Sequence, residues 1–338
     1  MSDPSAFTEP SRRSALLSNL ALSRASVDRA EHLRSDEQWW QRAQSSQDAV
    51  VLLLGSHGAP HTAGEANQSP RLMLVPADAP GIDEFGEPAL LGVDDDGQAV
   101  IARWVRAPQA EAASEMVRRH GTAEAEIRWL DLRAIGADLD DRDAGLLTTA
   151  VALLGWHGRH RHCPRCGDLT QVTAAGWSRH CPSCDGDQFP RTDPAVIVLV
   201  RSPETDRALL GRRSIWPTSW YSTLAGFVEA GESSEATVVR EVREEAGVEV
   251  DPGSLHYLGS QPWPFPASLM LGYHAWAASE AEPTPDGDEL AEARWISREE
   301  LLAGAESGEL LVPPSVSIAR RLIEQWYGAE LPGEWSRP

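Results

Sequence analysis

The chain of 338 residues is predicted to have an α+β fold, in which two α+β domains are joined by a small metal-binding module. Runs of β-branched residues and leucines, typical of buried strands, alternate with segments whose apolar residues recur at helical spacing. The length suits about two domains of roughly 100 to 200 residues each. The only four cysteines form two close pairs near the middle of the chain, where we place the module.

The first domain is predicted to span residues 1–155. Residues 20–43 have the apolar spacing of a helix, and DAVVLLLGS (48–56) has the pattern of a buried strand. Further strands are expected at the segments 71–78, 99–107 and 125–135, which Gly, Pro and Asp turns separate. Residues 143–160 carry apolar side chains round most of a helix, so this helix is expected to be buried and to lead into the cysteines.

The last domain is predicted to span residues 191–330. Pro194 breaks the chain just before AVIVLV (195–200), a β-branched run that predicts a central strand. Strand patterns follow at the segments 258–263 and 269–279, and helical patterns at 233–246, 297–303 and 315–327.

Composition and charge exclude several classes of protein. Apolar residues make up 41% of the chain, and thirteen tryptophans are more than a disordered protein carries. The net charge of −21 is the opposite of the basic footprint of a generic nucleic-acid binder. No apolar stretch is long enough to cross a membrane, and the first twenty residues lack the apolar core of a signal peptide. We therefore expect a cytosolic protein that has no membrane partner.

The cysteines predict a structural zinc site in a module at residues 156–190. The pattern is C-x2-C, fourteen residues, C-x2-C, and four thiolates close a tetrahedral zinc site with no open position. The alternative of four unrelated free cysteines does not explain the pairing. Four histidines nearby are possible alternative ligands, although the cysteines suffice. The zinc ligands are predicted to be Cys163, Cys166, Cys181 and Cys184, and the histidines are His157, His160, His162 and His180.

The same module is a basic island in an acidic protein. Residues 157–191 contain five arginines and four histidines against three aspartates. This charge would steer a phosphate-bearing substrate. A solvated surface without a functional role explains it equally well at this stage.

Three glutamates lie close together on the predicted helix at 233–246. Side chains three and four residues apart share a helix face, so Glu241, Glu244 and Glu245 are expected to project together. An ordinary solvated face would leave these like charges to repel one another. Oxygen ligands suit Mg²⁺ or Mn²⁺, so the cluster indicates attack of a water molecule on a phosphate chain with the help of a hard cation.

The pattern around this helix resembles the complete Nudix box. Gly226, Glu232, Arg240-Glu241-Val242, Glu244-Glu245 and Gly247-Val248 stand at the spacing of that motif without a departure. The resemblance to a Nudix hydrolase implies an α/β/α sandwich with a mixed sheet. It also implies a strand-loop-helix motif that binds divalent metal and cleaves a nucleoside diphosphate linked to another group.

Roles follow from this resemblance, position by position. Glu241 and Glu245 should bind the metal together with the backbone carbonyl of Ala225, and Glu244 should lie in or beside the cluster. Glu245 is our candidate for general base. Glu232 and Arg240 should form an internal ion pair that orients the loop on the helix. Gly247 fits the left-handed end of the helix.

A second motif, SQPWPFPAS (260–268), points to the substrate. Its three prolines are expected to exclude a regular ladder and to form a stiff, extended loop that holds two aromatic rings for stacking. Downstream of a Nudix box, this motif resembles the NADH pyrophosphatase (NudC-like) subfamily. The likeness extends from about residue 155 to residue 326, through FPRTDPAVI, LAGFVEAGE, DELAEARW and PPSVSIARRLIEQW, and is looser in the first domain.

The subfamily resemblance implies substrate contacts. Phe189 and Phe227 should stack a base, and Glu289 should add a metal or substrate contact. Ala319 should contact the substrate through its backbone. A substrate contact is also implied for Arg128 in IRWLDLR, where the sequence matches the subfamily less well. The helical stripe of Ile318, Leu322, Ile323 and Trp326 is better explained by core packing. The residues expected to line the nucleotide pocket are Gln261, Pro262, Trp263, Pro264, Phe265, Pro266, Ala267 and Ser268.

The implied reaction is hydrolysis of NADH or NAD⁺ to reduced or oxidised nicotinamide mononucleotide and AMP. The expected cofactors are two or three Mg²⁺ or Mn²⁺ ions and one zinc, and the expected assembly is a homodimer. Subfamily members also remove NAD caps from RNA 5′ ends by cleaving the same bond. A hypothesis of another class is a zinc-ribbon binding module with an inactive Nudix domain. The intact metal residues argue against this hypothesis.

Overall fold

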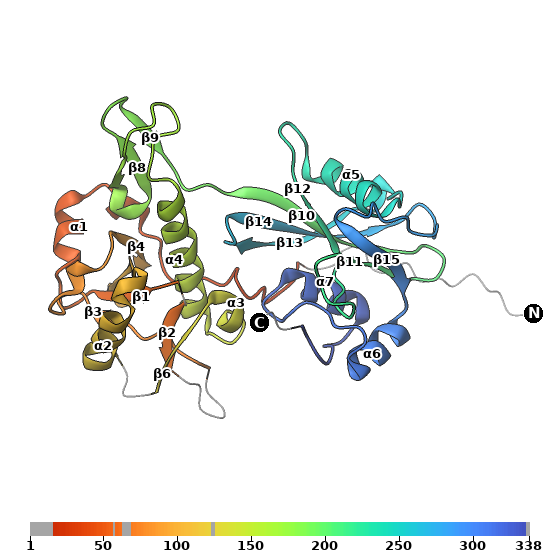
Figure 1. Cartoon of the computed structure of the whole chain (residues 1–338), viewed down its shortest axis with the longest axis horizontal. Coiled ribbons are helices and arrows are strands. Elements are labelled where there is room, and N and C mark those ends of the chain that lie inside the picture. Colours follow the sequence, from red (N-terminus) through yellow and green to blue (C-terminus); the bar gives the residue numbers. More distant parts are fainter. Residues whose placement is uncertain (1–15, 57, 63–68, 123–125, 336–338) are drawn as a thin grey trace, which may run out of the picture. The chain divides into compact units, whose positions relative to one another are not determined.

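The computed structural model describes residues 16–56, 58–62, 69–122 and 126–335, which divide into two compact units (Figure 1). One unit contains the described residues up to Asn19, the segment Ala195–Ser260 and the chain from Met270 onward. The other unit contains Leu20–Pro194 and Gln261–Leu269. The proline-rich loop therefore belongs to the same compact unit as the N-terminal region and the cysteine module. The three predicted domain boundaries stay a prediction.

A four-stranded sheet of order β3-β1-β5-β4 forms the centre of the Leu20–Pro194 unit. Strand β1 (Val50–Leu54) is buried along its whole length and pairs in parallel with β5 (Ala99–Trp104). Strand β3 (Val75–Pro76) and strand β4 (Pro88–Val93) pair antiparallel with β1 and β5 respectively. The strands predicted at 48–56 and 99–107 are confirmed, whereas only two residues of the predicted strand 71–78 join the sheet.

The predicted helix at 20–43 is wrong over most of its length. Helix α1 covers only Glu37–Ala43, and Asp36 starts it by accepting a hydrogen bond from the Trp39 amide. A single 3-10 turn, Glu31–Leu33, precedes it, and Ala30 has a left-handed backbone that a continuous helix does not allow. Leu20, Ala21 and Leu22 are buried without forming a helix, so tertiary burial accounts for the apolar residues that suggested one.

The segment predicted as a strand at 125–135, of which residue 125 lies outside the described residues, divides into a strand and a helix. Its first part is β6 (Ile127–Leu130), which pairs with β2 (Ala59–Thr62). The Asp131 carboxylate then accepts a hydrogen bond from the Ala134 amide and starts the short helix α3 (Leu132–Ile135). Helix α2 (Ala110–His120) lies earlier in the chain.

Helix α4 (Asp141–Arg159) confirms the long buried helix that the sequence predicted. Eleven of its residues are buried, and it packs against β4 and β5. The chain then enters a three-stranded antiparallel ribbon that carries the cysteines. Its strands are β7 (Gln171–Thr173), β8 (Ser178–Cys181) and β9 (Gly186–Gln188).

The second unit is organised around a six-stranded sheet. Strand β10 (Asp193–Arg201) is central as predicted, and the order β13-β14-β10-β11-β15 is completed by β12, which also pairs with β10. The remaining strands are β11 (Ala208–Arg213), β12 (Leu224–Phe227), β13 (His256–Trp263), β14 (Ser268–Trp276) and β15 (Leu290–Ile296).

Helices cover both faces of this sheet, which confirms the predicted α/β/α sandwich (Figure 1). Helix α5 (Ser234–Ala246) packs its valines on one face, in a core cluster that includes Tyr273 of β14. The next residue, His274, points to the opposite face, where its Nε2 lies 2.9 Å from the Leu322 carbonyl oxygen of α7 (Ile318–Tyr327). The remaining helix is α6 (Arg298–Ser307).

The apolar stripe of α7 is core, as the sequence analysis favoured. Ile318, Leu322, Ile323 and Trp326 are all buried.

The proline-rich motif is the tip of the hairpin between β13 and β14. Strand β13 continues through Pro262 to Trp263, so the prediction that the prolines exclude ladder structure is wrong at that position. The reason is that β13 is an edge strand, where a residue without an N–H is tolerated. The turn itself spans residues 264–267.

In the part of the chain that the structure describes, no helix combines the length and the apolar character needed to cross a membrane.

Candidate active site

The strand-loop-helix motif at residues 224–247 is built from local signals in the sequence. Strand β12 pairs with β10 from Leu224 to Phe227, and a loop leads to α5. Ser233 caps α5 by accepting a hydrogen bond from the Ala236 amide at 3.2 Å. Gly247 ends the helix with a φ of 66°, the left-handed conformation predicted from its position.

Gly226 allows the carboxylate of Glu241 to lie against strand β12. A Cβ atom at position 226 would overlap the Cδ and both carboxylate oxygens of Glu241. The absence of a side chain at this position of the motif therefore has a steric reason: only glycine lets the helix place a carboxylate directly on the strand.

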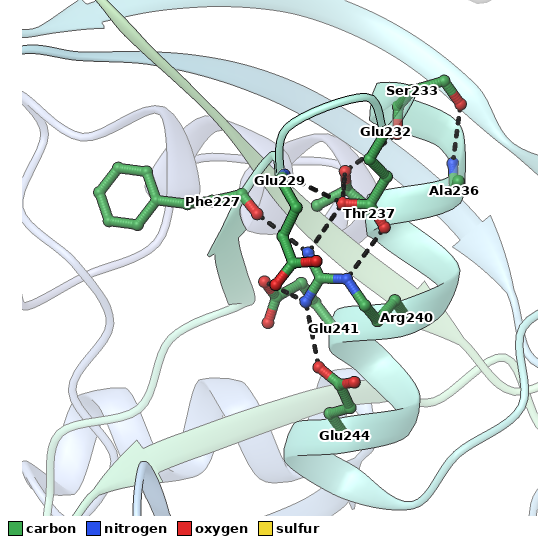
Figure 2. Close-up of polar contacts among 9 residues, drawn as sticks. All are labelled: Phe227, Glu229, Glu232, Ser233, Ala236, Thr237, Arg240, Glu241 and Glu244. Carbon is green, nitrogen blue, oxygen red and sulfur yellow. Dashed lines mark hydrogen bonds and ion pairs between the residues drawn. The ribbon is translucent and has the colours of Figure 1, made fainter.

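Arg240 and Glu232 form the ion pair that was predicted to orient the loop (Figure 2). The Arg240 Nε and Nη2 atoms each donate to one Glu232 oxygen at 2.9 Å, and Nη2 also donates to the Phe227 carbonyl at 3.0 Å. The Glu229 amide and the Thr237 hydroxyl donate to the same Glu232 carboxylate. Hydrogen bonding to Arg240 is the main reason that the pKa of Glu232 falls to about 2.

Arg240 also contacts two of the three clustered glutamates. Its Nη1 donates to Glu241 Oε1 at 2.9 Å and to Glu244 Oε2 at 3.0 Å (Figure 2). The Glu244 side chain is 55% exposed, whereas that of Glu241 is 14% exposed. Burial is the largest cause of the raised pKa of Glu241. Of the two, Glu241 is therefore the better-placed inward ligand.

Glu245 is a buried carboxylate with an unused oxygen. The residue is 6% exposed, and within the described ranges its Oε2 has no hydrogen-bond partner. Burial, followed by the charges of Glu241, Glu289 and Asp286, raises the pKa of Glu245 to about 8, and a hydrogen bond with the Ala225 backbone partly opposes this rise. A buried carboxylate that leaves one oxygen without a partner and lies near other carboxylates is costly without a cation, so these residues fit a divalent metal.

Glu289 and Asp286 add negative charge to the cluster from the loop before β15. Both raise the pKa of Glu245. The sequence analysis identified Glu289 and missed Asp286, whose carboxylate accepts the Glu289 and Leu290 amides and so holds the loop. The signal that could have found it is the run of three acidic residues in the segment 283–289, PTPDGDE.

The four cysteines come together as the zinc prediction requires. The Sγ atoms of Cys163 and Cys184 are 3.6 Å apart, and those of Cys166 and Cys181 are 3.4 Å apart. All four sulfurs lie within 4.8 Å of one another, close to the roughly 3.8 Å edge of a tetrahedron with Zn–S bonds of about 2.3 Å. The donor set therefore fits one structural zinc ion.

The proline-rich loop is held by residues of its own compact unit. Gln261 is fully buried, and its Oε1 accepts a hydrogen bond from the Leu22 amide at 3.4 Å. The rings of Trp263 and Phe265 meet edge to face at 5.1 Å, and the Arg133 guanidinium lies 4.0 Å from the Phe265 ring centroid. The sequence analysis missed Arg133, although it stands in the IRWLDLR stretch from which only Arg128 was chosen.

The other substrate candidates differ in exposure. Phe189 is 70% exposed and Phe227 is 57% exposed, so both rings offer stacking surfaces. Arg128 is an exposed residue of β6 that pairs with Glu126 at 3.7 Å. Ala319 is buried in the first turn of α7, where its amide donates to Ser317 Oγ at 3.3 Å. Phe189, Arg128 and the loop belong to one compact unit, and Phe227 and Ala319 to the other.

Three protein-family models match successive parts of the chain. Residues 47–156 match an NADH pyrophosphatase-like rudimentary NUDIX domain, residues 159–189 match the NADH pyrophosphatase zinc ribbon domain, and residues 191–313 match the NUDIX domain.

Similar proteins in bacteria and in animals are named NAD-capped RNA hydrolases. The NAD-capped RNA hydrolase NudC of Mycobacterium bovis (strain BCG / Pasteur 1173P2) is 40% identical over 317 residues, which cover 91% of this chain and 95% of that protein. The same figures hold for NudC of Mycobacterium tuberculosis (strain ATCC 25618 / H37Rv). The human NAD-capped RNA hydrolase NUDT12 is 41% identical over 199 residues, or 56% of this chain and 42% of that protein.

Proposed function

The chain belongs to the NudC family of Nudix hydrolases, and from this premise we propose that it hydrolyses the diphosphate of NADH or NAD⁺ to nicotinamide mononucleotide and AMP. The observation that carries the proposal is the buried carboxylate of Glu245, whose Oε2 has no hydrogen-bond partner among the described residues and which feels the charges of Glu241, Glu289 and Asp286. Such an arrangement suits divalent cations that bring a diphosphate to the protein.

The metal ligands in this proposal are Glu241, Glu245, the Ala225 carbonyl and Glu289, with Glu244 beside them. In the described part of the chain, only the cysteines form a tight group of ligand atoms, so the carboxylates are more widely spread. That spread suits ions that each take one or two carboxylates and complete their shell with phosphate oxygens and water. Bound Mg²⁺ or Mn²⁺, in two or three ions, supplies charge neutralisation of the diphosphate and acidifies a water molecule.

Glu245 is the proposed general base. The oxygen of the attacking water forms a bond to one phosphorus, the bridging P–O bond breaks, and the proton of the water passes to the Glu245 carboxylate. Glu245 suits this role because helix α5 fixes it and its surroundings exclude bulk water. Arg240 and Glu232 act as positioning residues, since they hold the loop after β12 on the helix that carries the ligands.

Substrate recognition is proposed for the residues that the family resemblance implied. Phe189 and Phe227 offer exposed rings for a base, and the loop Gln261–Ser268 offers Trp263 and Phe265 held by Arg133. Ala319 and Arg128 remain further proposed contacts.

Removal of NAD caps from RNA is a second proposed activity. It is favoured by the two mycobacterial relatives, which are named NAD-capped RNA hydrolases and are similar over nearly the full length of the chain. The bond cleaved is the same, and the RNA chain is attached through the adenosine. A homodimeric state and a cytosolic location also remain predictions.

The test is Mg²⁺-dependent release of AMP from NADH by the zinc-replete protein and by the variant Glu245→Gln. We expect kcat to fall by at least a hundredfold, because the amide cannot accept the proton and is a poorer metal ligand. Glu249→Gln, a change at an exposed residue just beyond the same helix, is the matched control and should keep wild-type turnover. Wild-type turnover by a folded Glu245→Gln protein would overturn the assignment of the base.

Substrate choice needs a panel compared by kcat/KM with Mg²⁺ and with Mn²⁺. The panel contains NADH, NAD⁺, ADP-ribose, diadenosine polyphosphates and NAD-capped RNA. A clear preference for ADP-ribose would contradict the proposed substrate and leave the Nudix chemistry standing. Absence of metal-dependent hydrolysis of every substrate would instead favour a zinc-ribbon binding module with an inactive Nudix domain.

A further inference from the structure

A cavity of about 550 Å³ lies between the rudimentary Nudix domain and the zinc ribbon, within one compact unit. One wall is formed by the residues just before β4. The others come from the end of β5 and the residues after it, from the last turn of α4, and from the ribbon. Four arginines line it, against one carboxylate, that of Glu87. The arginines are Arg106, Arg159, Arg161 and Arg179.

Arg179 is a buried cation that the ribbon holds in place. The residue is 3% exposed, and its Nε and Nη2 donate to the hydroxyl and the carbonyl of Thr170 at 2.7 and 2.8 Å. Its nearest carboxylate, Glu87, is 3.7 Å away and its side chain is 65% exposed, so the charge is weakly compensated. This weakly compensated guanidinium places a positive charge in the wall of the cavity.

His157 helps to orient Arg179 without adding charge. The Nε2 of His157 lies 2.8 Å from the Gly176 carbonyl oxygen, to which it donates, so its Nδ1 is free to accept from Arg179 Nη1 at 3.0 Å. Both contacts are satisfied together only by the neutral imidazole. Burial lowers the pKa of His157 and favours the same form.

The other three arginines are not used in ion pairs. Within the described ranges, none of Arg106, Arg159 and Arg161 lies within 4.0 Å of a carboxylate oxygen. Arg159 stands in the last turn of α4, where its positive charge compensates the partial negative charge at the carbonyl end of the helix, so its presence has a structural explanation. This explanation does not account for Arg106 or Arg179, which come from after β5 and from β8. Three separate segments therefore contribute positive charge to one cavity in a protein of net charge −21.

Arg159 connects this cavity to the proline-rich loop. Its Nη2 donates to the Pro266 carbonyl at 3.1 Å, and both residues belong to the same compact unit. In the proposed function that loop lines the nucleotide site. The cavity therefore borders the proposed nucleotide site, to which one of its arginines is hydrogen-bonded.

We propose that the cavity lined by Arg106, Arg159, Arg161 and Arg179 binds backbone phosphates of the RNA chain in NAD-capped RNA. This inference rests on the proposed function, since it assigns a site to the part of that substrate which NADH lacks. Arginine forks match phosphate oxygens in pairs, and the contacts carry no base specificity. The rudimentary Nudix domain and the ribbon thereby distinguish a capped RNA from free dinucleotide.

The test uses the full-length, zinc-replete chain and the double variant Arg106→Gln/Arg161→Gln. Both residues are exposed, and neither has a place in the catalytic cluster. The control, Arg118→Gln/Arg119→Gln, removes the same charge from exposed residues of α2 that do not line the cavity. Zinc content is measured for each protein because Arg161 lies close to Cys163.

Two measurements are compared among the three proteins. The first is kcat/KM for NADH and for a single-stranded NAD-capped RNA of about 20 nucleotides. The second is binding of the same RNA with a 5′-monophosphate in place of the cap, by fluorescence anisotropy over a range of salt concentrations. This second measurement does not depend on catalysis.

We expect the cavity variant to hydrolyse NADH like the wild type and to lose about tenfold in kcat/KM for capped RNA. Two lost phosphate contacts should also reduce the slope of log K against log salt by about 1.4, at about 0.7 per contact for single strands. Equal losses in the control variant, unchanged capped-RNA kinetics and salt slope, or an equal loss with NADH would each overturn the site. Failure of the wild type to hydrolyse any NAD-type substrate would refute the proposed function instead, while the anisotropy still reports on the cavity.

Discussion

Replacement of Gly226 by alanine is expected to displace a proposed metal ligand while leaving the stability of the fold nearly unchanged. The new Cβ atom would overlap the carboxylate of Glu241. Gly226 lies in strand β12 and is not among the glycines with positive φ, so alanine can adopt its backbone conformation. The strain therefore falls on the end of the flexible Glu241 side chain.

The size of the effect follows from the contact. Ordinary Cβ contacts lie at 3.4–4 Å, so the Glu241 carboxylate must retreat by more than about 1 Å. A displacement of about 1 Å in a catalytic group costs on the order of a hundredfold in rate. The free energy of unfolding should change by less than about 1 kcal/mol, because Glu241 can rotate toward solvent without opening a cavity.

The assay is kcat/KM for NADH as a function of Mg²⁺ concentration, with thermal unfolding measured on the same samples. We expect Gly226→Ala to lose about a hundredfold in kcat/KM and to need more Mg²⁺, with a nearly unchanged melting temperature. Gly253→Ala is the matched control, since a Cβ there makes only an ordinary contact of 3.4 Å with Asp251. If Gly226→Ala keeps the activity and the Mg²⁺ dependence of the wild type, Glu241 is not a metal ligand at this place.

Three further predictions concern the ion pair, a buried histidine and the zinc. Arg240→Lys keeps the charge but cannot make both 2.9 Å bonds to Glu232 and the bond to Phe227, so kcat/KM for NADH should fall ten- to a hundredfold; an unchanged value would remove the positioning role. Burial lowers the pKa of His274 to about 4 from about 6.5 in the unfolded chain. The stability that the neutral ring contributes to the folded protein is therefore fully present above pH 6.5 and is lost as the pH falls toward 4. Unfolding measured by tryptophan fluorescence should show a loss of up to about 3 kcal/mol over this window, which His274→Gln reduces and the exposed-site control His32→Gln does not. Elemental analysis should find one zinc per wild-type chain and less in Cys181→Ser, with a lower melting temperature; a full zinc content in the variant would contradict the four-cysteine site.

The sequence predicted the elements whose signal is local. The β-branched run at 195–200 gave the central strand, and the apolar circumference of residues 143–160 gave the buried helix α4. Gly247 gave the end of α5, and the cysteine spacing gave the cluster of four sulfurs. In each case the residues that determine the structure are close together in the sequence, so their pattern can be recognised without tertiary information.

Elsewhere the local signal was overridden by burial or by position in a sheet. The apolar residues at 20–22 suggested a helix, but they are buried in an irregular segment. Pro262 suggested a loop, but an edge strand has room for it. Arg133 and Asp286 were not chosen because the residues they act on are distant in sequence. Arg133 lies over the Phe265 ring, and the charge of Asp286 acts on Glu245.

By itself, the sequence identified the residues that we propose carry the chemistry: the four cysteines, the glutamates of α5 and the proline-rich loop, because motif spacing fixes residue type and order. Only the tertiary structure decided the state of each group. Burial raises the pKa of Glu245, the bare backbone of Gly226 admits the Glu241 carboxylate, and Arg240 divides its hydrogen bonds among three glutamates. These properties depend on what surrounds a side chain in space, and segments far apart in the chain supply those surroundings.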